Sequence, residues 1–327
     1  MSTASAWKRR AITIPRTFAV FVLLTVLSPV LFAIALLVDV VRALTGSRQF
    51  ATIRVVAFGW VYFAVETIGI LRLTFVWLTF RRNEAVFRRR VRKVQMWFAR
   101  NLLRGVTSLF GLQMTVDDPQ VATPGPMVMF VRHSSIIDTL LPPALIGDQF
   151  DLRLRWVVKA ELLADPALDL AGLWLDNCFV DRSAGLGEIR RIRRLGQGLT
   201  EDEGVVIYPE GSRFTEARRK RAIEKLTETS PDLAQRARSM THVLPPRPGG
   251  ALALLQAGTD VVLCGHVGLD GFAKVTDIWT GNLVGSTVQV WFHRVPAAEI
   301  PKGRDDRVTW LFDQWAALDR EIAQRSD

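Results

Sequence analysis

Cysteine is almost absent from this sequence, since Cys178 and Cys264 are the only two among 327 residues. Each lies in its own apolar run, and the pair has neither metal-ligand nor redox spacing. A disulfide framework and a cysteine-based metal site are therefore excluded. Both thiols are expected to be reduced core residues, which suits a cytoplasmic globular part.

Acidic residues are nearly missing from the first third of the chain. Residues 1–104 carry 17 Lys and Arg but only Asp39, Glu66 and Glu84, whereas residues 105–327 carry 25 basic and 29 acidic side chains. A nucleic-acid-binding protein would carry its basic charge on the folded domain, so no nucleic-acid partner is expected. Hydrophobic residues make up 49% of the chain, and the basic N-terminal third favours contact with a membrane.

One uncharged run, Phe18–Val38, follows a basic cluster at residues 8–16. Its 21 residues are enough to cross a hydrocarbon core of roughly 30 Å. A cleaved signal peptide is the alternative, because Ala33-Ile34-Ala35 resembles a cleavage site. That triplet lies inside the apolar run, however, so we expect an uncleaved transmembrane helix.

A second apolar run, Val55–Leu71, is interrupted by Glu66 and extends with one further charge to Phe80. A carboxylate inside a span costs a few kcal/mol unless it is protonated, paired or near an interface. A re-entrant or interfacial helix is therefore the alternative to a second span. If both runs span, they form a hairpin that turns near Gly46-Ser47.

Basic clusters flank both outer ends of this pair, at residues 8–16 and 81–93. The positive-inside bias places both ends in the cytoplasm. We therefore expect an integral protein of the cell inner membrane, with everything after residue 81 on the cytoplasmic side.

Residues 88–103 have the pattern of a basic amphipathic helix, in which Val91, Val94, Phe98 and Leu102 recur at helical spacing. Such a helix suits an anionic membrane surface, and packing on a globular domain is the equal alternative. The sequence thus divides into a membrane anchor (1–80), a basic amphipathic surface helix (81–111) and a catalytic domain (112–327).

The last segment alternates short apolar runs with helical patterns. The predicted strands are Met127–Val131, Arg155–Val158, Cys178–Val180, Val205–Tyr208, Val261–Gly265 and Val288–His293. The predicted helices are Ile137–Ala144, Leu186–Leu199, Glu216–Thr227, Gly250–Ala257 and Arg307–Ala323. This alternation predicts an α/β domain with a mixed, mostly parallel sheet flanked by helices.

The buried strand Met127–Val131 runs directly into His133, and Asp138 follows five residues later. Catalytic groups gather at strand ends of open α/β sheets. A His there, with an Asp that folds back onto its ring, can act as a general base with its orienting group. A structural His hydrogen-bonded to an N-capping Asp is the alternative.

Three later stretches favour the catalytic interpretation. Lys159 and Arg182 each follow a predicted strand, where two converging cations suit an anion. Pro209-Glu210-Gly211 breaks the next strand, and the loop then presents Arg213 beside Ser212, with a guanidinium that can bind phosphate through two hydrogen bonds. A rigid loop with Pro245, Pro246, Pro248 and two glycines then leads into an apolar helix.

Together the four stretches resemble the conserved blocks of the glycerolipid acyltransferase superfamily, and most closely its lysocardiolipin- and lysophosphatidylinositol-acyltransferase-like branch. The resemblance covers residues 110–295, with His133 and Asp138 in the first block, Phe179 to Arg182 in the second, Glu210 to Arg213 in the third and Pro246 in the fourth. Arg132, Ile136 and Asp176 depart from the family pattern.

The resemblance implies transfer of an acyl group from acyl-CoA or acyl-carrier protein to a glycerolipid hydroxyl, with His133 and Asp138 catalytic. It implies substrate binding by Lys159, Arg182, Glu210, Gly211, Ser212, Arg213 and Pro246. We expect 1-acylglycerol-3-phosphate as acceptor, because several cations surround the site, and a headgroup-bearing lysophospholipid is the alternative. No metal-ligand set is visible, and no cofactor is implied beyond the acyl donor.

Two other classes of function compete with this one. A serine hydrolase would use Ser134 or Ser135, yet the chain has no Gly-x-Ser-x-Gly elbow. A non-enzymatic membrane scaffold would not require the four blocks to coexist. Of the remaining histidines, His242 opens the Pro-rich loop, and His266 and His293 end strands without an Asp at useful spacing. All three are expected to be structural.

Overall fold

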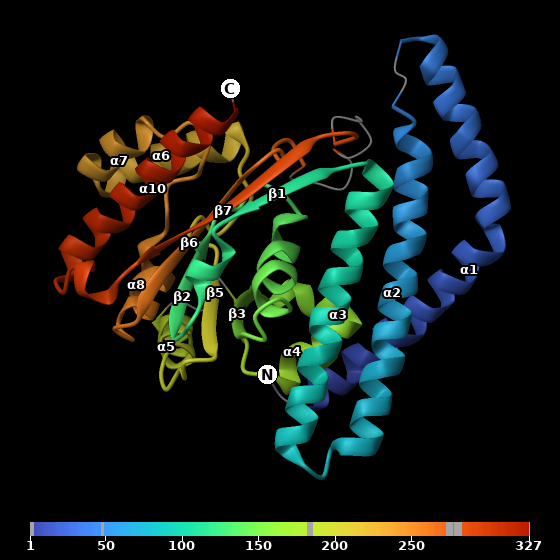
Figure 1. The fold of residues 1–327 in the computed structure, drawn as a ribbon, viewed down its shortest axis with the longest axis horizontal. Helices are drawn as coiled ribbons and strands as arrows, with labels where there is room; N and C mark the ends of the chain where they lie inside the picture. The colour runs from blue at the N-terminus through green and yellow to red at the C-terminus, as the bar shows by residue number, and fades with distance from the viewer. Residues whose placement is uncertain (1–2, 47–48, 182–185, 273–276, 278–282, 327) are drawn as a thin grey trace.

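The structure is a computed structural model that describes residues 3–46, 49–181, 186–272, 277 and 283–326. A seven-stranded sheet forms its centre, in the order β1-β7-β6-β2-β5-β3-β4 (Figure 1). The strands are β1 Gln113–Asp117, β2 Met127–Val131, β3 Arg153–Lys159, β4 Cys178–Val180, β5 Glu203–Ile207, β6 Asp260–Val267 and β7 Thr287–Val295. Only the β6–β7 pair is antiparallel among these described strands. The predicted α/β class with a mixed, mostly parallel sheet is confirmed.

Strand β2 is central because all five of its residues are buried. Successive side chains point to opposite faces of a strand. Met127, Met129 and Val131 accordingly enter a core that they share with helix α3 (Glu84–Phe110). Val128 and Phe130 enter the second core, on the other face of the sheet. A continuous apolar run was thus the correct signal for a strand covered on both faces.

The second face is covered by helices α5, α7, α8 and α10. The helices beyond α3 are α4 Pro166–Trp174, α5 Leu186–Leu195, α6 Glu216–Thr229, α7 Pro231–Arg238, α8 Pro248–Leu255 and α10 Arg304–Ser326. Helices α4 and α7 and strand β1 were not predicted from the sequence. Strand β1 lies at the sheet edge with alternating exposure, so it lacks the continuous apolar run that marks the buried strands.

The predicted helix Ile137–Ala144 is wrong in type. A 3₁₀ turn, Asp138–Leu140, and a π turn, Pro143–Gly147, occupy this stretch. Pro142 and Pro143 have no backbone N–H to donate to a regular α-helix.

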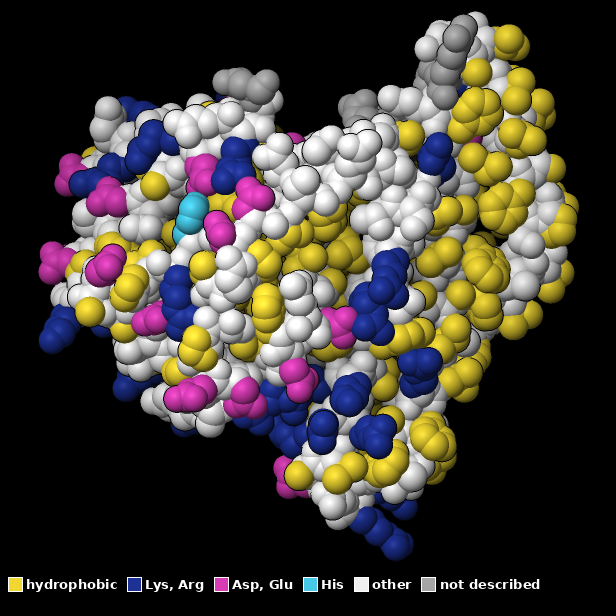
Figure 2. Space-filling model, in the orientation of Figure 1, with side chains coloured by type: hydrophobic (Ala, Val, Ile, Leu, Met, Phe, Trp, Pro, Cys, Tyr) yellow, Lys and Arg dark blue, Asp and Glu magenta, His cyan; other side chains and the backbone are white. Residues whose placement is uncertain are grey.

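Two long helices precede α3, namely α1 (Thr3–Leu44) and α2 (Ala51–Phe80). Both are long and apolar enough to cross a membrane, and they fit the expected transmembrane hairpin. The most apolar part of α1 is almost wholly exposed, whereas nearly half of that of α2 is buried against the rest of the molecule. Figure 2 shows the resulting apolar surface along this side.

Glu66, the carboxylate inside the second apolar run, has a hydrogen-bond donor in α4. Its Oε1 atom accepts a hydrogen bond from the Ala167 backbone N–H at 2.7 Å, in the first turn of α4. The Tyr62 hydroxyl of α2 donates to Asp165, the residue that caps α4. Helix α2 therefore holds the N-terminal end of a helix in the α/β part of the chain.

Candidate active site

Strands β2, β3, β5 and β6 run in the same direction, so their carboxyl ends meet at one edge of the sheet. His133 follows β2, Lys159 ends β3, and Tyr208 to Arg213 follow β5. His266 is the second-last residue of β6, where it pairs with Val290 of β7. Parallel pairing thus brings together residues from separate sequence blocks.

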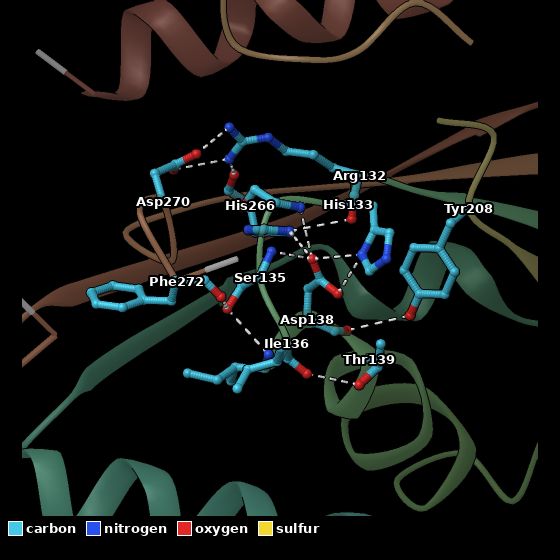
Figure 3. A network of polar contacts seen from close by, with 12 residues as sticks. Arg132, His133, Ser135, Ile136, Asp138, Thr139, Tyr208, His266, Asp270 and Phe272 are labelled. Carbon is cyan, nitrogen blue, oxygen red and sulfur yellow. Dashed lines mark hydrogen bonds and ion pairs between the residues drawn. The ribbon is translucent and has the colours of Figure 1, made fainter. Parts of the chain in front are cut away.

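His133 and Asp138 form a hydrogen-bonded pair at this edge (Figure 3). The His133 Nδ1 atom lies 3.0 Å from Asp138 Oδ1 and 3.2 Å from Oδ2. Asp138 is fully buried, and its Oδ2 atom also accepts the backbone N–H groups of Ser134 and Ser135, each at 2.8 Å. The carboxylate is therefore oriented by several donors at once.

Burial by itself would raise the pKa of Asp138, but His133 and His266 lower it well below its usual range. Asp138 is consequently ionised and accepts a hydrogen bond from the Nδ1–H group of His133. The lone pair of the imidazole then lies on Nε2, on a ring that is 13% exposed. This is the arrangement of a general base that is ready to accept a proton.

The loop after β5 is hydrogen-bonded to both backbone polar groups of His133, its N–H and its carbonyl. Glu210 is buried; its Oε1 atom accepts from His133 N at 2.8 Å and its Oε2 atom accepts from Leu244 N at 2.9 Å. Phe214 N donates to His133 O at 2.7 Å. Burial raises the pKa of Glu210 to about 8, although the two N–H groups and Arg132 oppose this. Glu210 thus joins the first, third and fourth sequence blocks.

Arg213 lies close enough to the pair for its charge to act on Asp138. Burial lowers the pKa of Arg213, and the nearby Asp138 opposes this lowering. The Arg213 carbonyl accepts from Arg218 Nη1 at 2.9 Å, which secures the backbone of the loop. A guanidinium beside the base can bind an anionic part of a substrate.

The other predicted binding residues occupy different surroundings. Gly211 has φ +67°, a conformation that favours glycine, and its N–H donates to Tyr208 O at 2.9 Å. Ser212 follows in the same loop and is partly exposed, and Lys159 lies at the edge that carries the base. Pro246 is buried, and the next residue, Arg247, donates its N–H to Pro209 O at 2.8 Å. Arg182 lies outside the described residues.

Three residues that the sequence analysis did not assign to the site lie behind the pair. Arg132 is fully buried and forms an ion pair with Asp270. Its guanidinium also donates to the carbonyls of His266 and His242. No Asp lies at useful spacing from His266 in the sequence, yet its Nε2 atom lies 3.7 Å from Asp138 Oδ2 in the fold. The signal for Arg132 in the sequence was a charged residue at the end of a buried strand, at a position that departs from the family pattern.

Neither serine next to the base is placed as a nucleophile. The Ser135 hydroxyl donates to Phe272 O at 3.3 Å and accepts from Ile137 N. The Ser134 hydroxyl is buried and has no hydrogen-bond partner among the described residues. Within the same part of the chain, no group of three or more His, Cys, Asp or Glu could hold a metal ion.

Comparisons with known proteins indicate the family and the fold of the chain. Residues 113–266 match the family described as Acyltransferase. No curated protein matches the chain. The chain is similar in structure to the 1-acyl-sn-glycerophosphate (LPA) acyltransferase PlsC from Thermotoga maritima, with a TM-score of 0.56 and 14% identity, over 83% of this chain and 95% of that one. At this identity the similarity shows a shared fold.

Proposed function

Because this chain belongs to the glycerolipid acyltransferase superfamily and is an acyltransferase, we propose that it acylates the free hydroxyl of 1-acylglycerol-3-phosphate to form phosphatidate. The observation that carries this proposal is the His133–Asp138 pair, whose Nε2 atom is left to accept a proton. Acyl-CoA and acyl-carrier protein are both suitable donors, since each presents a thioester.

In the proposed reaction, His133 Nε2 takes the proton of the acceptor hydroxyl as its oxygen attacks the thioester carbonyl. The C–O bond forms, the C–S bond breaks, and the imidazolium returns its proton to the leaving thiolate. Asp138 stabilises the imidazolium and keeps the ring in the required orientation. No acyl-enzyme forms, and both substrates are bound together.

We assign the acceptor phosphate to Arg213, with Lys159 and Arg182 as further cations. Gly211, Ser212 and Pro246 would shape the loops around the glycerol. Both oxygens of Glu210 already accept backbone N–H groups, so its contribution is to hold the loop of the base and the fourth block together.

Arg213→Lys should still be impaired although it keeps the positive charge. The substitution removes the planar pair of donors, and losing one charge-assisted contact costs about 1.5–3 kcal/mol, or about ten- to a hundredfold in kcat/KM. The loss should appear with acceptors that have a terminal phosphate and be smaller with headgroup-bearing ones. The matched control is Arg221→Lys on the exposed face of α6. A raised KM for the thioester donor, with the acceptor spared, would instead assign Arg213 to the donor.

We further propose that the protein is integral to the inner membrane with the catalytic part in the cytoplasm. The support is the basic residues that flank the apolar helices. Cations also gather near the lower ends of α2 and α3 in Figure 2. Exposed Arg82 and Arg89 belong to this region, where they would contact anionic lipid headgroups.

Removing these two charges should weaken the preference of the membrane-inserted protein for anionic lipid. Each surface cation contributes about 1 kcal/mol, so Arg82→Gln/Arg89→Gln should lower the selectivity for phosphatidylglycerol over phosphatidylcholine by about thirtyfold. Spin-labelled lipids in vesicles that contain the reconstituted protein measure this selectivity at low ionic strength, and the difference should shrink at about 0.5 M salt. The control is Arg304→Gln/Arg320→Gln, because these two arginines of α10 are also exposed. Equal loss in both double variants would contradict a local contact.

The experiment that tests the proposed function is an acyl-transfer assay with a panel of lysolipid acceptors. Preference for lysophosphatidate supports the proposal, whereas preference for a headgroup-bearing acceptor selects the alternative within the same family. Release of free fatty acid with an acylated Ser134 or Ser135 would indicate a hydrolase. Absence of transfer to every acceptor from either donor would contradict the proposal.

A further inference from the structure

Asp138 lies between two histidines that are far apart in the sequence (Figure 3). His133 contacts it from the partly exposed side, and His266 of β6 approaches it from the interior. The His266 Nε2 atom lies 3.3 Å from Arg132 O and 3.7 Å from Asp138 Oδ2. Both Asp138 and His266 are fully buried.

The surroundings of His266 determine which ring nitrogen carries the proton. Nδ1 is buried and has no hydrogen-bond partner among the described residues. A buried N–H without an acceptor costs about 1–3 kcal/mol, so the proton lies on Nε2. That N–H then points between two oxygens, the Arg132 carbonyl and the Asp138 carboxylate. At 3.7 Å the contact with Asp138 is longer than a regular hydrogen bond, and it acts through the electrostatic attraction of the N–H dipole.

Arg132 secures His266 from the opposite direction. Its Nη1 atom donates to His266 O at 2.5 Å, and its ion pair with Asp270 keeps the guanidinium in place. Arg132 also accepts from the His266 ring through its own carbonyl. Because Arg132 immediately precedes His133, the contacts of His266 reach both members of the catalytic pair.

We propose that His266 is a positioning residue for acyl transfer, which holds the Asp138 carboxylate from its buried side so that Oδ1 stays on His133 Nδ1. This inference rests on the proposed function, to which it adds a second histidine that touches no substrate. It also accounts for Arg132 and Asp270, which keep the His266 segment beside the base.

His266→Phe tests the proposal because it keeps a ring of similar volume but has no donor. The expected result is a fall in kcat of about ten- to a hundredfold, since a small misplacement of a catalytic group has an effect of this size. The KM values for donor and acceptor should stay within about twofold, because His266 does not bind either. His266→Gln restores an N–H donor near the Nε2 position and should recover most of kcat.

A spectroscopic readout separates this proposal from the proposed function. The His133 Nδ1–H proton bonded to Asp138 should give a far-downfield proton resonance, which His133→Ala identifies by its loss. We expect the resonance to shift or broaden in His266→Phe and to return in His266→Gln. His293→Phe is the matched control, because His293 pairs with Glu321 and not with the site.

The outcomes are distinct. Unchanged kcat and an unchanged resonance in folded His266→Phe would overturn the proposal. If the resonance behaves as expected while the wild-type protein transfers no acyl group, the proposed function fails and the positioning of Asp138 stands. If His266→Phe does not fold, His266→Met is read in its place, because it also lacks a donor and its flexible side chain fits an irregular space.

Discussion

His133→Ala is expected to lower kcat for acyl transfer by about 10²–10⁴, the range that general-base catalysis contributes. This substitution should leave the backbone around residue 133 unchanged. The loop is held through the His133 backbone, by Glu210 on its N–H and Phe214 on its carbonyl. Alanine keeps both bonds and removes only the ring, so the fold should be preserved. Single-turnover transfer by the purified variant, beside its thermal unfolding curve, measures both effects.

Asp138→Asn is the companion variant. Asn keeps the size of the side chain but has no charge, and it replaces one acceptor oxygen by an N–H₂ group. Asp138 accepts from His133, Ser134 and Ser135, so Asn cannot accept all of these bonds. We expect a loss of activity similar to that of His133→Ala. Near wild-type turnover in a folded His133→Ala sample would refute the mechanism.

Replacing Arg9 and Arg10 together by Gln should destabilise the protein by about 3–5 kcal/mol, the usual cost of leaving a buried charge unpaired. The charge is Asp169 of α4, whose side chain is fully buried. Arg9 grips both of its oxygens, at 2.8 and 2.9 Å, and Arg10 approaches it at 3.3 Å. The first turns of α1 are therefore fastened to a helix in the α/β part of the chain. Denaturant unfolding in detergent micelles would measure the loss.

A third substitution serves as the control for this cluster. Adding Asp169→Leu to the double variant removes the orphaned carboxylate, so much of the lost stability should return. Arg16→Gln, at an exposed position of the same helix, should have little effect. If the double variant unfolds at the wild-type denaturant concentration, the ion pairs do not stabilise the attachment. The same contacts imply that removal of the anchor would expose a buried charge in α4.

The pattern of residues along the chain was sufficient to predict the fold class and the buried strand that His133 follows. The apolar run Met127–Val131 was correctly predicted as a buried strand. Every residue of it is apolar because its side chains enter the two cores on either face of the sheet. Helices α1 and α2 were equally predictable, because a long apolar run is visible in the local composition of the sequence. The residues of the first three blocks were recognisable because they end or follow strands β2, β4 and β5, where short-range patterns change abruptly, whereas the fourth block precedes helix α8.

The partners of His266, Glu210 and Asp169 lie far from them in the sequence, so local sequence patterns could not predict these contacts. The place of His266 beside Asp138 follows from β6 pairing with β2 in parallel, a register between residues more than 100 positions apart. Glu210 was assigned to substrate from its block, yet its oxygens meet backbone groups of two other blocks. The Asp169 ion pairs join residues 160 positions apart. Sequence patterns thus predicted which residues are buried or end a strand, and only strand order and helix packing decided which of them touch.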